Sequence, residues 1–180
     1  GILISDFVYG VISPKILEQV ILISKKKNKL IFGDLQCSSQ IGLITKFKNF
    51  SLLCPNEKEA RLSLQDKESG LELLSRKLLS ETSCERLIMK LGAQGLIAYD
   101  TVSKNELRSQ AFPALSVNPV DVTGAGDSLL SIMAAGLSSK QQMMTITALS
   151  CCMSALSVET MGNKPISSKS LRLFVENLMR

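Results

Sequence analysis

The chain has 180 residues, 45% of them apolar and 21% charged, so it can bury the core of one compact domain and is not expected to be disordered. Its net charge of +5 is modest, and no aromatic-rich basic pattern accompanies the lysine run at 25–29, so we expect that run to be a solvated helix end and no nucleic-acid partner. Histidine is absent, which excludes Ser-His-Asp and Cys-His catalytic sets and a histidine-ligated zinc site within this chain.

The first third of the chain alternates between short apolar runs and helical patterns. A strand is expected at 2–5, followed by a helix that begins at Pro14, with Ser13 as its N-cap, and ends in the lysines at 25–27. The next expected elements are a strand at 29–32 that stops at Gly33-Asp34, a weaker helix at about 39–48 and a strand at 51–54 closed by "PNE".

The rest of the chain continues this alternation. The expected elements are a helix at 66–81 with Leu71, Leu74 and Leu78 on one face, strands at 86–91 and 95–100 joined by the turn "GAQG", a polar hairpin loop at 101–105 before "ELRSQAF", and helices at about 125–137, 140–158 and 168–179. Short apolar strands alternating with helices indicate an α/β fold with a mostly parallel sheet covered on both faces. We therefore expect residues 1–180 to form a single domain, a three-layer α/β/α sandwich.

Cysteine usage and hydropathy indicate the cellular setting. The five cysteines, at 37, 54, 84, 151 and 152, include no C-x-x-C pair, which favours reduced thiols in a cytoplasmic protein. The longest uncharged run, 141–158, is rich in Gln, Ser and Thr, so a buried helix is expected there and no membrane span. No secretory signal is visible, and residues 1–5 read as the interior of a strand, as in a fragment that begins in mid-fold.

The stretch "DVTGAGDSLL", 121–130, places two glycines beside an acid at the expected start of a helix. Gly124 and Gly126 allow a tight turn whose N–H groups, with the positive end of the helix dipole, suit a phosphate. Asp127 would repel that phosphate, which is best explained if it is a base that takes a proton from an attacking hydroxyl. The alternative is an ordinary helix start with an N-terminal acid and packing glycines.

Two well-known phosphate loops do not match. The pattern G-x-x-x-x-G-K-S/T occurs nowhere in the chain. The dinucleotide pattern G-x-G-x-x-G needs a third small residue where this chain has Leu129. A dinucleotide-dependent oxidoreductase is therefore disfavoured.

The stretch 121–127 resembles the second signature of the ribokinase-like (PfkB) carbohydrate kinases, D-T-x-G-A-G-D, at six of seven positions. Three further segments are similar to family elements in the expected order: "PNEKE" with N-x-x-E at Asn56 and Glu59, "MKLGAQG" at 89–95, and "SALSVETMGNKP" at 154–165. The resemblance spans nearly all of the chain. It matches only the later part of a family member, without the usual N-terminal strands, Gly-Gly signature and β lid.

The resemblance implies ATP and Mg²⁺ as cofactors and transfer of the γ-phosphoryl group to a sugar hydroxyl. Asp127 would be the base, and the N–H groups of Ala125, Gly126 and Asp127 would hold the developing charge. The remaining implied contacts are Asn56 and Glu59 to Mg²⁺ through water, Lys90, Gly92, Gly95, Thr123, Gly126 and Ser150 to the nucleotide, and backbone carbonyls of Asp121 and Thr123, with Ser157 and Gly162 as weaker candidates, to a monovalent cation such as K⁺.

Several of these residues also have plain structural explanations. Asn56 could be a turn residue after Pro55, and Glu59 a first-turn helix acid. Lys90 could be a solvated strand residue, although its place in an apolar run favours an anion partner. Gly92 and Gly95 could be turn glycines.

The opening "SDFVYG", 5–10, resembles the heptose-phosphate kinase branch of the family, and "FGDLQ", 32–36, stands where that branch has Asp-Pro-Lys. Leu35 and Gln36 replace the proline and lysine, so a lysine contact there is not expected. The implied partner is a sugar or sugar phosphate, and the full-length protein could form a homodimer. Alternatives are a nucleotide-binding module without catalysis and a fragment that is inactive without its N-terminal half.

Overall fold

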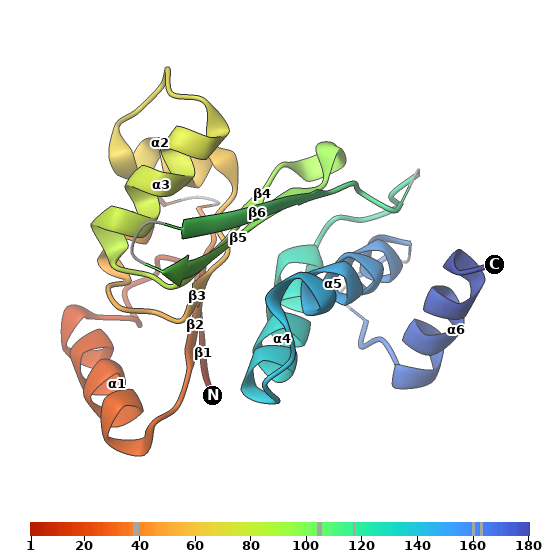
Figure 1. Cartoon of the computed structure of the whole chain (residues 1–180), viewed down its shortest axis with the longest axis horizontal. Helices are drawn as coiled ribbons and strands as arrows, with labels where there is room; N and C mark the ends of the chain where they lie inside the picture. Colours follow the sequence, from red (N-terminus) through yellow and green to blue (C-terminus); the bar gives the residue numbers. More distant parts are fainter. Residues whose placement is uncertain (38–39, 104–105, 117, 160, 163) are drawn as a thin grey trace.

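The computed structural model describes residues 1–37, 40–103, 106–116, 118–159, 161–162 and 164–180. Six strands form one sheet in the order β1-β2-β3-β4-β5-β6, with helices on both sides of it (Figure 1). The strands are β1 Ile2–Asp6, β2 Ile31–Leu35, β3 Leu52–Leu53, β4 Arg86–Lys90, β5 Leu96–Ser103 and β6 Glu106–Phe112. The helices are α1 Pro14–Lys27, α2 Glu57–Leu64, α3 Leu71–Thr82, α4 Ala125–Ser138, α5 Met143–Val158 and α6 Ser168–Leu178, with 3₁₀ turns η1 Ile44–Lys46 and η2 Gly92–Gln94.

The sheet is parallel from β1 to β4 and antiparallel from β4 to β6. Connections that include η1, α1 or the α2–α3 pair separate the parallel strands, and such crossovers are what parallel pairing requires. The chain returns from β4 to β5 within a few residues around η2, and so short a connection can only reverse its direction. The mostly parallel sheet expected from the sequence is thus a mixed sheet whose antiparallel hairpin occupies one edge.

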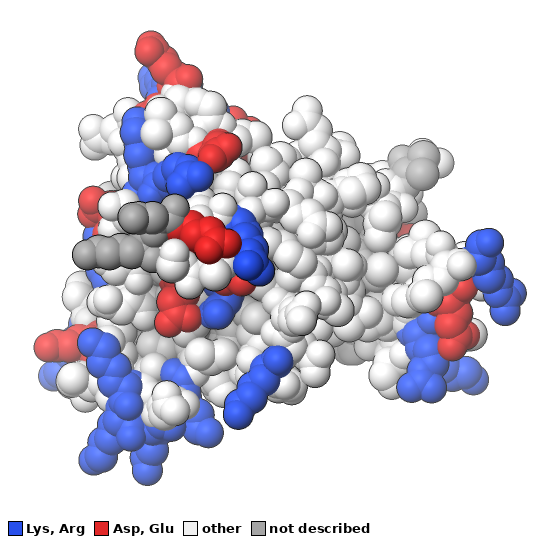
Figure 2. Space-filling model, in the orientation of Figure 1, with Lys and Arg blue, Asp and Glu red and all other residues white. Residues whose placement is uncertain are grey.

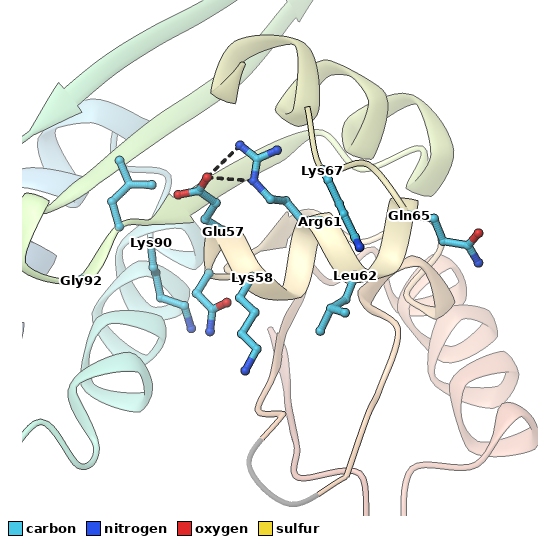
Figure 3. Close-up of a pocket in the computed structure, with 10 residues that line it drawn as sticks. Glu57, Lys58, Arg61, Leu62, Gln65, Lys67, Lys90 and Gly92 are labelled. Carbon is cyan, nitrogen blue, oxygen red and sulfur yellow. Dashed lines mark hydrogen bonds and ion pairs between the residues drawn. The ribbon is translucent and has the colours of Figure 1, made fainter. Parts of the chain in front are cut away.

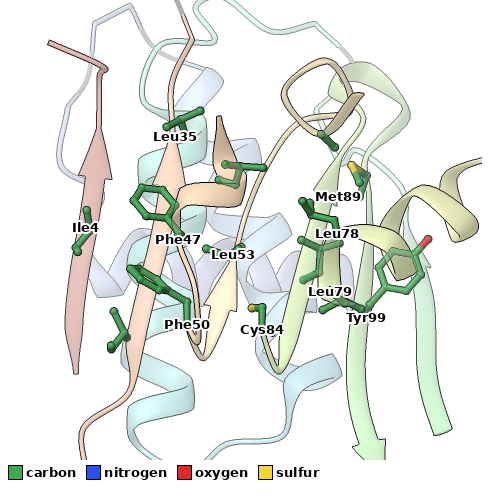
Figure 4. Packing of buried hydrophobic residues seen from close by; sticks show 14 of the residues in the cluster. Ile4, Leu35, Phe47, Phe50, Leu53, Leu78, Leu79, Cys84, Met89 and Tyr99 are labelled. Atoms are coloured by element: carbon green, nitrogen blue, oxygen red, sulfur yellow. The ribbon is translucent and has the colours of Figure 1, made fainter. Parts of the chain in front are cut away.

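Two hydrophobic clusters lie on opposite faces of this sheet. The first joins β1–β5 to α1 and α3 and includes Leu17 of α1. Phe50 and Leu78 of this cluster are seen in Figure 4. The second joins the other face to α4 and α5 through residues such as Phe32 and Met133. The three-layer α/β/α sandwich is therefore confirmed. Helix α6 packs on α5, away from the sheet (Figure 1).

Helix α1 shows the caps that its sequence predicts. The Ser13 hydroxyl accepts the N–H of Ile16 at 3.4 Å, and Pro14 is the first helical residue. The helix ends in three lysines, and Asn28 follows in the left-handed conformation. The run at 25–29 is exposed at every position, and basic side chains gather over this end of α1 in Figure 2, as expected of a solvated helix end.

Strand β2 is longer than the sequence indicated, which corrects the prediction that it stops at Gly33-Asp34. Residues 33 to 35 continue the ladder opposite β1, with Asp34 paired to Ser5. Glycine is required here by close packing, because a Cβ at Gly33 would lie 2.9 Å from the ring of Phe50. The glycine therefore marks a close contact with a ring and not the end of the strand.

Two helix predictions need correction. The helix expected at about 39–48 is only the short turn η1 within residues 40–48, and residue 39 lies outside the described residues. The helix expected at 66–81 begins later, at Leu71, and is preceded by α2, which was not predicted. The hairpin loop expected at 101–105 is largely strand, because β5 runs to Ser103, and residues 104–105 lie outside the described residues.

All five cysteines are free thiols, and Cys151 and Cys152 are buried within α5 as expected. Among the described residues, no helix has both the length and the apolar character needed to cross a membrane.

Candidate functional site

The candidate site lies where the carboxyl ends of the parallel strands meet the first turn of α4. Ser5 is near the end of β1, Asp34 near the end of β2 and Lys90 at the end of β4. The backbone of Asn56, just beyond β3, bridges to Lys90. In open α/β sheets this edge is where ligands bind.

The first turn of α4 has the geometry of an anion site. Gly124 precedes the helix with φ 81° and ψ −1°, a left-handed conformation that favours glycine. The N–H of Ala125 donates to the carbonyl of Val122 at 3.3 Å. The predicted set of three anion-binding N–H groups is therefore reduced to those of Gly126 and Asp127, which lack a protein acceptor within the described part of the chain.

Gly126 brings this turn against two charged side chains. A Cβ at this position would lie 3.3 Å from both Asp34 Oδ2 and Lys90 Nζ. The helix start, with its positive dipole end, therefore adjoins an ammonium group as well. Any larger side chain at Gly126 would enter the space in front of Lys90.

Asp127 is held by one donor from β1 and one from the residue that follows β2. Ser5 Oγ donates to Asp127 Oδ1 at 3.1 Å, and Gln36 Nε2 donates to Asp127 Oδ2 at 3.3 Å. The carboxylate is half-buried and lies in the first turn of α4. Each oxygen accepts one hydrogen bond from a side chain, so lone pairs remain for a further donor.

Lys90 and Asp34 form a buried ion pair. Lys90 Nζ donates to both oxygens of Asp34, at 2.9 and 2.8 Å, and Asp34 Oδ1 also accepts the N–H of Leu35 at 3.0 Å. Burial raises the pKa of the Asp34 carboxyl, and the ammonium opposes that effect. Burial acts to lower the pKa of Lys90, but the Asp34 carboxylate outweighs it and the net direction is upward. The anion partner that the sequence favoured for Lys90 is, in this structure, Asp34.

Asn56 and Glu59 form a capping box at the start of α2. Asn56 Oδ1 accepts the N–H of Glu59 at 2.8 Å, and Glu59 Oε2 accepts the N–H of Asn56 at 2.8 Å. Glu59 Oε1 also accepts the N–H of Cys37 at 3.4 Å, and burial raises the pKa of the Glu59 carboxyl. Both side chains therefore hydrogen-bond to backbone N–H groups, which agrees with the plain structural explanations of Asn56 and Glu59. They are better placed to support a metal through water than to ligate it.

A pocket of about 650 Å³ continues from the site along α2 (Figure 3). Its lining includes Lys90 and Gly92, which are predicted nucleotide contacts, and Asn56, which is predicted to support Mg²⁺. Lys58 and Lys90 extend to the same side in Figure 3, and the Arg61 guanidinium is paired with Glu57 at 2.7 Å. Lys90 is paired with Asp34, but the lining also carries Lys58 and Lys67, which form no ion pair among the described residues, and this positive charge suits an anionic ligand.

Gly95 has a structural requirement of its own. It adopts φ 92°, and a Cβ there would lie 2.0 Å from the carbonyl oxygen of Phe112. Its N–H donates to Gly92 at 3.0 Å, which closes the turn between β4 and β5. Gly95 is therefore a turn glycine, and a nucleotide contact from it stays a prediction.

The predicted cation residues lie together in a separate loop. Asp121 Oδ1 accepts the N–H of Thr123 and Asp121 Oδ2 that of Gly162, both at 2.9 Å. These bonds lower the pKa of the Asp121 carboxyl. Ser157 is buried nearby in α5, where its hydroxyl donates to the carbonyl of Ser154. Within the described residues, no group of three Cys, Asp or Glu side chains could hold a metal ion, and a cation bound by carbonyl oxygens stays a prediction.

Ser150 is not brought to this edge. It is fully buried in α5, and its hydroxyl donates to the carbonyl of Thr147 at 2.7 Å. In this structure it offers no surface to a nucleotide.

Conversely, sequence reasoning missed Ser5, Asp34 and Gln36 as site residues. The signal for two of them was strand alternation, since Asp34 and Gln36 share the face of β2 that carries Phe32 and faces α4.

Together, the sheet edge, the helix start and the adjoining acid define an open α/β protein with a candidate anion site at the carboxyl end of its strands. The family model described as "pfkB family carbohydrate kinase" matches residues 2–169. Because that match covers most of the chain, the chain belongs to the pfkB family of carbohydrate kinases. The family resemblance drawn from 121–127 is confirmed.

Two curated proteins illustrate what the chain is similar to. The chain is 31% identical over 145 residues to the bifunctional protein HldE of Campylobacter fetus, covering 79% of this chain and 30% of that protein. It is 28% identical over 181 residues to HldE of Campylobacter jejuni strain 81116, covering 97% of this chain and 36% of that protein. The chain thus spans about a third of the length of these curated relatives.

Solved structures show the same architecture. Phosphofructokinase-2 from Escherichia coli in complex with potassium matches 99% of this chain and 57% of its own, with a TM-score of 0.79 and 17% identity. The ribokinase of Thermotoga maritima matches 98% of this chain and 57% of its own, with a TM-score of 0.74 and 24% identity. At these identities the likeness establishes the fold, which is ribokinase-like.

Proposed function

We propose that this chain, residues 1–180 as one domain, is the C-terminal nucleotide-binding part of a kinase that transfers the γ-phosphoryl group of ATP to a sugar or sugar-phosphate hydroxyl. The observation that carries the proposal is the convergence at the start of α4. There Gly126 adjoins Lys90, and the next residue, Asp127, is a carboxylate held by the side chains of Ser5 and Gln36.

Asp127 accepts the proton of the attacking hydroxyl in this proposal. Its oxygens keep lone pairs for that proton, and it lies in the turn whose N–H groups receive the phosphoryl group. The N–H groups of Gly126 and Asp127 then stabilise the charge that develops during transfer. Lys90 adds a positive charge on the same side of the turn.

The residues present fit a magnesium nucleotide. Two N–H groups at a helix start, Lys90 and the basic lining of the pocket suit the phosphates. Asn56 and Glu59 would support Mg²⁺ through water, since their own oxygens accept backbone N–H groups. When bound, the metal would neutralise phosphate charge. Because the similar phosphofructokinase-2 was solved in complex with potassium, K⁺ is proposed for the loop of Asp121 and Thr123.

The proposed acceptor is a heptose phosphate, with ribose and fructose derivatives as alternatives. The similarity of residues 5–10 to the heptose-phosphate kinase branch supports this choice, as do the HldE relatives. In the structure, however, Asp6 is used within the fold: its carboxylate accepts the N–H of Val8 and pairs with Lys46. The sugar contacts are therefore not expected from Asp6.

A first prediction tests the anion turn. MgADP is expected to bind saturably to the chain in calorimetric titration, and Gly126→Val is expected to weaken binding by at least roughly 100-fold, about 2.7 kcal/mol. The valine side chain would enter the space in front of Lys90 Nζ. Gly70→Val is the matched control, because a Cβ at Gly70 meets no atom within 4 Å and its φ is −62°.

The outcomes separate the candidate functions. Equal affinity of the Gly126→Val variant and the wild type would contradict a phosphate site at this turn. Binding without sugar phosphorylation by the full-length protein would favour a non-catalytic nucleotide-binding module. Hydride transfer from NADH without ATP would favour the oxidoreductase alternative.

A further inference from the structure

The two side chains that hold Asp127 have no role in the chemistry described so far. Ser5 lies on β1 and Gln36 directly follows β2, so each approaches α4 from a different strand. Their distances to the carboxylate, 3.1 and 3.3 Å, place one donor on each oxygen. Both donors are far from Asp127 in the sequence and meet it only through the fold.

We infer that Ser5 and Gln36 are positioning residues for Asp127, which fix the orientation of its carboxylate toward the acceptor hydroxyl. This inference rests on the proposed function for its catalytic meaning, and the contacts themselves can be tested without it.

Strand register places the two donors, Ser5 and Gln36, on the same face of the sheet. Ser5 stands opposite Asp34 in the parallel ladder, and the N–H of Gln36 donates to the carbonyl of Asp6 at 2.9 Å, which extends the pairing by one step. Residues opposite one another, and residues two apart on one strand, share a face of the sheet. Ser5, Asp34 and Gln36 therefore all face α4, and the carboxylate is held from β1 and from the residue that follows β2.

Charged side chains lie close to the Asp127 carboxylate. The carboxylate of Asp34 interacts electrostatically with Asp127 from β2. Lys90, on β4, is bound through its ammonium to both oxygens of Asp34. Among the described residues, the side chains that donate to the Asp127 carboxylate are Ser5 and Gln36, and both are uncharged. The two donors therefore hold the carboxylate without adding a charge beside it.

The contacts are tested first by NMR on the 180-residue chain. Ser5→Ala and Gln36→Leu are each expected to move the side-chain carboxyl ¹³C resonance of Asp127. Ser131→Ala is the matched control, because the Ser131 hydroxyl donates to the backbone oxygen of Asp127 at 2.7 Å and not to its carboxylate. A resonance that responds to neither donor variant, or equally to the control, would overturn the inference whatever the activity of the protein.

The catalytic meaning is tested by kinetics on the full-length protein. Each donor variant is expected to lower kcat by roughly 10- to 100-fold with little change in KM for ATP, because the base is misplaced while the nucleotide site is intact.

The two kinds of failure can be told apart. An NMR response together with unchanged kcat in both donor variants would overturn the positioning role. An NMR response in a protein that phosphorylates no sugar would instead contradict the proposed function, and the contacts to Asp127 would stand.

Discussion

Asp127→Asn is expected to remove most turnover, by roughly 10²- to 10⁴-fold, while leaving MgATP affinity within about threefold of the wild type. The asparagine has the shape of the aspartate but cannot take a proton from the acceptor hydroxyl. Its oxygen can still accept from Ser5, and the Gln36 amide can turn to offer its own oxygen to the new NH₂ group. The loss is therefore expected in kcat and not in folding.

The measurement is steady-state kinetics of the full-length protein, with calorimetric titration of MgADP on the same variant. Asp100→Asn is a suitable control, because it removes an acid on β5 that pairs with Arg86 at 3.0 Å, at the opposite end of β4 from Lys90. A variant Asp127→Asn that keeps the wild-type kcat would refute the base assignment. A variant that loses both kcat and nucleotide affinity would point to a role in shaping the turn.

The anion turn could be predicted because its determinants are local. Two glycines, an acid and the following apolar helix pattern lie within ten residues, and the structure places them at the start of α4. The sequence could not show that the N–H of Ala125 donates to Val122, because that depends on how the preceding loop enters the helix. It likewise could not show that Ser150 would face the interior of a helix that is buried on most sides.

The errors in the predicted fold arose where one sequence feature has two structural explanations. Gly33 was interpreted as a strand end, although in the structure it makes room for the Phe50 ring and the strand continues. Asn56 and Glu59 were interpreted through their spacing in a kinase motif, although N-x-x-E is also the pattern of a capping box. That pattern could have predicted helix α2.

The charged centre of the site was beyond sequence reasoning for a different reason. Asp34 and Lys90 are 56 residues apart, and nothing local in either segment indicates that they meet. The same holds for Ser5 and Asp127, which are 122 residues apart. Such contacts are set by strand order, and a correct strand end for β2 would have been needed to place Asp34 and Gln36 toward α4.

The Asp34–Lys90 pair leads to the second large expected effect, on stability. Lys90→Met is expected to lower the free energy of unfolding by roughly 3–5 kcal/mol, because it leaves the buried Asp34 carboxylate without its counter-ion. The double variant Asp34→Leu/Lys90→Met removes both charges and is expected to recover most of that loss. The measurement is urea unfolding with a common m-value. Arg76→Met, which breaks an exposed pair with Glu72, is the control and is expected to cost less than about 1 kcal/mol.

The double variant then separates the two roles of the pair. If Lys90 serves only the fold, the stable double variant should bind MgADP as tightly as the wild type. We expect it instead to bind at least roughly tenfold more weakly, about 1.4 kcal/mol, because the ammonium beside Gly126 is gone. A double variant as unstable as Lys90→Met would contradict the account of the pair as a buried charge and its counter-ion, since neither charge would remain to be left uncompensated.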